Sequence, residues 1–95
     1  MQAFTILRLR RLPNGSGQGF SGDVVCAGQR EPFSVITEGG SLVVTLAGLD
    51  LRLAVDPFVA MRCHWHEISD AVRDGLGRLM SSPSYAAQRQ IAEAA

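Results

Sequence analysis

The chain has 95 residues, of which 46% are hydrophobic and 19% are charged. This composition suits one modest core and argues against disorder or a fibrous repeat. Nine basic residues balance nine acidic ones, so bulk charge gives no reason to bind nucleic acid or acidic lipid. No apolar run reaches the roughly 20 residues of a membrane helix.

The first half of the chain alternates polar and apolar residues as β-strands do. Strands are predicted at about 4–12, 20–27, 33–38, 41–46 and 49–55. In an extended first strand, Leu7 and Leu9 lie on one face. Arg8 and Arg10 lie on the opposite face, together with Ile6.

Glycine-containing pairs predict the tight turns between these strands. Gly39-Gly40 is the strongest hairpin signal, because both central residues of a type I′ turn need positive φ. Ala47-Gly48 is interpreted as a second turn, with a bulge in one long strand as the alternative. Pro13–Gly19 is predicted to be a loop. It does not resemble a phosphate-binding loop, because a strand rather than a helix follows it and the chain has no Lys.

The periodicity changes after Asp56-Pro57, a strong helix start because Asp accepts from unpaired amides and Pro suits the first turn. One amphipathic helix is predicted over about 57–79, and Ser81-Ser82-Pro83 separates it from a tail helix at about 84–93. The apolar residues of the long helix recur in one stripe that should pack on the sheet. They are Phe58, Met61, Trp65, Ile68, Val72, Leu76 and Leu79.

Together these elements predict an α+β fold in a single domain, 1–95. An antiparallel four- to five-stranded β-meander carries one amphipathic helix packed on one face and a short C-terminal helix. The N-terminal residues lack the pattern of a secretory signal. We therefore expect a cytoplasmic protein in which Cys26 and Cys63 are reduced thiols, with one disulfide between them as the alternative.

The segment Cys63–Glu67 has the residue types of a metal or catalytic site. On a continuous helix, His64 and His66 diverge by about 200° and cannot bind one ion. In an extended segment they would share a face. The helix start at Asp56-Pro57 favours the first geometry, so we expect no metal, no cofactor and no catalytic residues. A metal-dependent or hydrolytic site around Cys63, His64 and His66 is the alternative.

The absence of a recognisable catalytic set favours a small non-enzymatic protein-interaction module that binds another protein's surface. Because all basic residues are Arg, the composition is typical of a bacterial or phage chain. A narrower hypothesis is a phage or mobile-element inhibitor of a host defence machine. A homodimer would also fit, through strand pairing or packing of the tail helix.

Charge on the long helix is expected to separate into two flanks, which would suit a partner of complementary charge. Arg62, His66 and Arg73 form one flank, and Glu67, Asp70 and Asp74 form the other. The remaining partner-binding candidates are Arg8, Arg10, Arg11 and Tyr85. A nucleic-acid-associated module that uses the Arg8, Arg10 and Arg11 patch is the second alternative.

Overall fold

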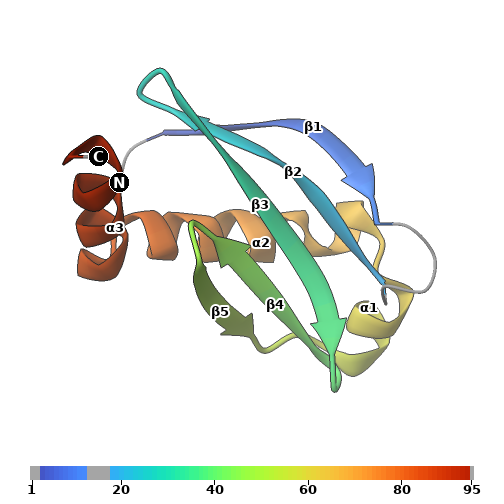
Figure 1. The fold of residues 1–95 in the computed structure, drawn as a ribbon. Helices are drawn as coiled ribbons and strands as arrows, with labels where there is room; N and C mark the ends of the chain where they lie inside the picture. Colours follow the sequence, from blue (N-terminus) through green and yellow to red (C-terminus); the bar gives the residue numbers. More distant parts are fainter. Residues whose placement is uncertain (1–2, 13–17, 95) are drawn as a thin grey trace.

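The computed structural model describes residues 3–12 and 18–94. Within these ranges the chain folds into a five-stranded antiparallel sheet in the order β1-β2-β3-β4-β5, with α2 across one face (Figure 1). The strands are β1 (Thr5–Arg11), β2 (Gly19–Cys26), β3 (Gln29–Glu38), β4 (Ser41–Leu46) and β5 (Leu49–Leu53). The helices are α1 (Pro57–Arg62), α2 (Trp65–Met80) and α3 (Pro83–Ala94). This is the predicted α+β meander. Residues 13–17 of the predicted loop lie outside the described residues.

Two-residue turns connect the last four strands. Gly39 and Gly40 have φ of 59° and 81°, the left-handed values that a type I′ turn requires. Ala47 and Gly48 adopt the same conformation, with φ of 54° and 78°. The interpretation of Ala47-Gly48 as a turn between two strands is therefore confirmed.

Strand β3 begins four residues earlier than the predicted Phe33. The two-residue turn at Ala27-Gly28 reverses the direction of the chain, so that Gln29 pairs with Cys26. Pro32 is tolerated in this extension because the pairing of β3 with β4 starts only at Phe33. The missing N–H of Pro32 therefore interrupts no pairing with β4.

Strand β1 contains a bulge that the alternating pattern did not predict. The register passes from Leu7 opposite Asp23 to Arg10 opposite Ser21, with one extra residue on β1, and Arg8 has a φ of 57°. The bulge reverses which side chains face the core. Leu9 packs against the core, whereas Leu7 is exposed. The prediction that Leu7 and Leu9 share a face is therefore wrong.

One face of the sheet carries the hydrophobic core, and α2 covers it along β4 and β5 (Figure 1). The approach is close: a Cβ added at Gly75 would lie 3.2 Å from Leu53 Cδ1. From the strands, the buried side chains are Phe20, Val24, Phe33, Val35, Leu42, Val44, Leu46 and Leu53. From α2 they are Ile68, Val72, Leu76 and Leu79, which confirms this half of the predicted stripe.

The predicted continuous helix over 57–79 is wrong, because it breaks at Cys63. This residue has φ 51° and ψ 52°, which is left-handed, and it ends α1. His64 is extended and precedes the first residue of α2. The 100° spacing of a helix therefore does not continue across the break from α1 to α2. As a result Phe58 and Met61 leave the stripe and are 65% and 62% exposed.

Helix α3 packs against α2 at its first turn. The Ser82 hydroxyl accepts from the Tyr85 amide (3.2 Å), as expected of a capping residue next to Pro83. The Tyr85 side chain is buried, and its hydroxyl donates to Glu31 Oε1 (2.8 Å). Of the described helices, none is long and apolar enough to cross a membrane.

Because the helix breaks at Cys63, Leu76 on α2 and Phe58 on α1 should differ in their sensitivity to truncation to Ala. Leu76→Ala should lower the free energy of unfolding by about 2–5 kcal/mol, because it leaves a cavity in a fully buried site. Phe58→Ala should change it by less than about 0.5 kcal/mol, because this ring is exposed. Urea unfolding monitored by circular dichroism measures both values. Equal, large losses would show that Phe58 belongs to the buried stripe after all.

Candidate functional site

The junction between α1 and α2 is held in place by contacts around Cys63. Its side chain is fully buried in the core. Its N–H donates to the Val59 carbonyl (2.9 Å), and its own carbonyl accepts a long hydrogen bond from Arg11 Nη2 (3.4 Å). The Arg11 guanidinium also lies over the Phe20 ring, 4.7 Å from its centre. Strand β1 therefore supports the turn between the two helices.

This turn brings His64, His66 and Glu67 together on the surface. One donor atom from each residue lies within 4.8 Å of the other two. His64 and His66 are exposed, whereas the Glu67 side chain is 26% exposed. The two imidazole rings meet edge to face, with centres 5.6 Å apart. The expected divergence of the histidines is therefore wrong. His64 is extended and outside α2, so helical spacing does not separate it from His66.

Cys63 does not join this group, contrary to the alternative site of Cys63, His64 and His66. The residue with them is Glu67. Burial raises the pKa of the Cys63 thiol, although the nearby Arg11 charge acts in the opposite direction. A buried, neutral thiol is a poor nucleophile and a poor metal ligand. Neither Cys63 nor Cys26 is in a disulfide.

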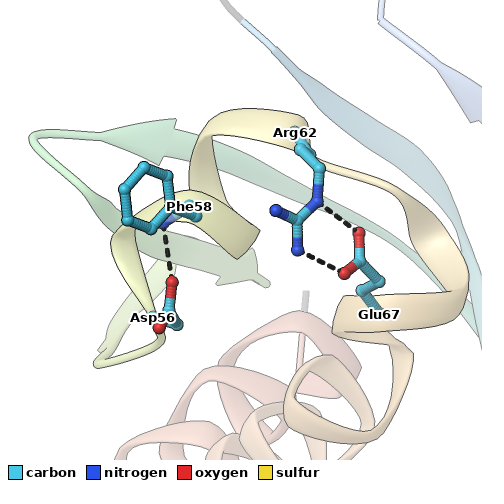
Figure 2. A network of polar contacts seen from close by, with 4 residues as sticks. All are labelled: Asp56, Phe58, Arg62 and Glu67. Carbon is cyan, nitrogen blue, oxygen red and sulfur yellow. Dashed lines mark hydrogen bonds and ion pairs between the residues drawn. The ribbon is translucent and has the colours of Figure 1, made fainter.

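Arg62 and Glu67 form a two-pronged ion pair across the junction (Figure 2). Arg62 Nε donates to Glu67 Oε1 (3.0 Å), and Nη2 donates to Oε2. The hydrogen bonds from Arg62 lower the pKa of the Glu67 carboxyl. The pair joins a residue of the expected positive flank to one of the expected negative flank. The predicted separation of charge is therefore wrong at this point.

The remaining acidic and basic candidates on α2 lie further along the helix. Asp74 pairs with Arg78 one turn later, with 2.9 Å between Asp74 Oδ2 and Arg78 Nε. Asp70 and Arg73 are exposed. The exposed ion pair between Asp74 and Arg78 contributes little to stability.

The candidates on β1 and α3 differ in their surroundings. Arg10 donates a long hydrogen bond to Ser21 Oγ (3.5 Å), and Arg11 is taken up by its contacts with Phe20 and Cys63. Arg8 lies exposed in the bulge. Tyr85, which we expected on the surface, is buried and bonded to Glu31. Because its ring covers the core, Tyr85 cannot offer a flat contact surface.

Helix α1 adds an apolar surface that the sequence did not reveal. Asp56 Oδ1 caps the helix by accepting from the Phe58 amide (2.8 Å; Figure 2). Val59 and Ala60 face the core, so the opposite side of the helix carries Phe58 and Met61. A cavity of about 350 Å³ opens between α1 and the β3–β4 turn. Its lining comprises Thr37, Gly39, Gly40, Pro57, Ala60 and Met61.

Comparison with known protein families, with curated proteins and with solved structures finds no match to this chain.

The ion pair at the junction gives a pH-dependent prediction. The folded pKa of the Glu67 carboxyl is depressed, so the pair stabilises the fold above the ordinary pKa of Glu. That stabilisation is lost as the pH falls through the lowered folded value. Arg62→Ala should return the pKa of Glu67 towards its ordinary range. Carboxyl carbon shifts followed by NMR across pH 2–6 measure the change, and an unchanged titration would contradict the ion pair.

The two thiols should differ in reactivity. A soluble thiol reagent should modify Cys26, which is half-buried, in the native protein at neutral pH. Cys63 should react only after denaturation, because it is buried and its raised pKa keeps it protonated. Mass spectrometry of the modified chain counts the labels. Native labelling of a Cys26→Ser variant would contradict the packing of Cys63.

Proposed function

We propose that this chain is a non-enzymatic protein-interaction module and that α1, with the β3–β4 turn, is its contact surface. The observation that carries the proposal is the exposure of Phe58 and Met61 on one side of α1, where Met61 also lines the cavity. Aromatic residues and Met are enriched at protein interfaces. Large apolar side chains that are adjacent, exposed and next to a cavity mark an interaction site better than scattered ones do.

The surroundings of this surface favour a protein as the occupant. Two ion pairs lie at the elements that form this surface: Arg62 with Glu67 at the end of α1, and Glu38 with Arg52 beside the β3–β4 turn. A protein interface typically has an apolar centre and such a polar, mixed rim. A polyanion would need an excess of positive charge. We therefore assign the surface to a partner protein that inserts an apolar side chain into the cavity.

The proposed contact surface on α1 differs from the charged face of α2 that the sequence suggested. The expected charged face of α2 offers Asp70, Arg73 and Asp74, which are solvated side chains. Binding energy at interfaces concentrates in a few apolar or aromatic anchors rather than in exposed charges. Phe58 and Met61 have that character. An inhibitor that covers a host protein would be one narrower case of this proposal.

Site-specific photo-crosslinking tests the proposal. A photoreactive phenylalanine analogue replaces Phe58, and in a matched control it replaces Leu7, an exposed apolar residue on β1. In the native host, position 58 should crosslink one defined protein that position 7 does not. Equal products from both positions, or none from position 58, would overturn the proposal. A crosslinked dimer of the chain itself would replace it with self-association.

Binding of the purified crosslinked partner supplies the second measurement. Phe58→Ser should weaken it about thirtyfold, the equivalent of about 2 kcal/mol for a central aromatic anchor. Leu7→Ser should leave the Kd unchanged. Both variants should keep the wild-type melting temperature, because both side chains are exposed. If Phe58→Ser binds as tightly as wild type, α1 is not the contact surface.

A further inference from the structure

The three side chains at the junction have the composition of a metal site. His64 and His66 each offer a ring nitrogen, and Glu67 offers a carboxylate oxygen, within 4.8 Å of one another. Two imidazoles and one carboxylate form a known donor set of zinc sites and of non-haem iron sites. In both classes they leave further positions open for water. The exposure of these residues gives an ion direct access.

The backbone that carries these residues is held in place before any ion binds. The buried Cys63 side chain, its hydrogen bond to Val59 and the contact from Arg11 hold the turn. His64 is the residue before α2, and its carbonyl accepts the hydrogen bond of the first helical turn from the Glu67 amide (2.9 Å). His66 and Glu67 therefore follow it in the first turn of a sixteen-residue helix. A fixed backbone lowers the entropic cost of gathering the ligands.

Coordination needs only side-chain rotation from this arrangement. Ligand atoms around one tetrahedral Zn²⁺ lie about 3.3–3.6 Å apart, given metal–ligand distances near 2.0–2.2 Å. The donor atoms of this group are within 4.8 Å and belong to exposed residues. Turning the two imidazoles toward the Glu67 carboxylate, which Arg62 holds in place, closes the difference without disturbing the core.

The local charges select the kind of ion. The N-terminus of α2 and the Arg62 guanidinium are both positive, so a cation must gain its binding energy from strong donors. Imidazole binds Zn²⁺, Ni²⁺ and Cu²⁺ well, whereas Mg²⁺ and Ca²⁺ prefer oxygen ligands. Arg62 also holds the Glu67 carboxylate through hydrogen bonds, as groups around metal ligands commonly do.

We propose that His64, His66 and Glu67 form a binding site for one divalent transition-metal ion, with Zn²⁺ as the best fit. The apolar anchors of the proposed contact surface, Phe58 and Met61, are not ligands, although Glu67 also belongs to the ion pair at the rim of that surface. Water fills the remaining positions around the ion. The buried thiol of Cys63 takes no part.

Zinc titration of the untagged chain tests the site directly. The chain has two histidines, and both belong to the site, so their imidazole proton signals in NMR report on it without background. Calorimetry should show one Zn²⁺ per chain, and both imidazole signals should shift together. Mg²⁺ should shift neither. If Zn²⁺ moves neither signal, the proposal is overturned.

Matched variants identify the ligands. His64→Ala, His66→Ala and Glu67→Gln should each weaken Zn²⁺ binding at least tenfold. Asp70→Asn, which removes the same charge from the same helix outside the group, should bind as wild type does. Cys26→Ser should also bind Zn²⁺ normally, because the half-buried Cys26 thiol is not one of the ligands. Zinc binding that survives the His64→Ala/His66→Ala double variant, or that is lost in Cys26→Ser, would overturn the assignment.

Two controls keep these outcomes separate from loss of folding and from the contact surface. The ligand variants should retain the wild-type circular dichroism spectrum without metal. His64→Ala and His66→Ala should also keep the melting temperature, because both residues are exposed. Glu67→Gln should melt slightly lower, because it removes the charge that pairs with Arg62. Phe58→Ser should bind Zn²⁺ normally. If Phe58→Ser loses the partner but keeps Zn²⁺, the two sites act separately, as proposed here. If it loses both, the metal assignment to His64, His66 and Glu67 alone is wrong.

Discussion

The buried side chain of Cys63 holds its own backbone in the left-handed conformation, and the surface around α1 follows from that constraint. A left-handed residue other than Gly costs about 1–2 kcal/mol. Here the packed thiol, the hydrogen bond to Val59 and the Arg11 contact hold it. The turn rotates α1 away from the stripe of α2. It exposes Phe58 and Met61, and it places His64 beside His66.

The sequence predicted the fold wherever a pattern continued through an element. The five strands, the turns at Gly39-Gly40 and Ala47-Gly48 and the buried half of the α2 stripe follow from periodicity and from glycine. Two of the structural errors concern single residues with positive φ that no glycine marks. Arg8 reverses the faces of β1, and Cys63 divides the long helix. At each, tertiary contacts override the local preference of the residue.

The candidate sites were predicted less well for the same reason. A helical wheel through the break separates His64 from His66 and buries Phe58 and Met61, and all of these assignments fail at Cys63. One signal was present in the sequence: the short spacing of two histidines followed directly by Glu67 suits an interrupted helix. Tyr85 was misplaced because a thinly apolar tail gives no hint that its first turn is buried. Function has to be argued from these sites rather than from the fold.

The strand order has a consequence for how fast this protein folds. Each strand pairs with its neighbour in the sequence, and three of the four connections are two-residue turns. Most of the sheet contacts therefore close short loops, which keeps the contact order low for a β-rich chain. Isolated hairpins form in about 1–10 μs. Docking of the helical half of the chain on the finished sheet is then the longest-range event, so it is the step most exposed to competing aggregation through the uncovered apolar face.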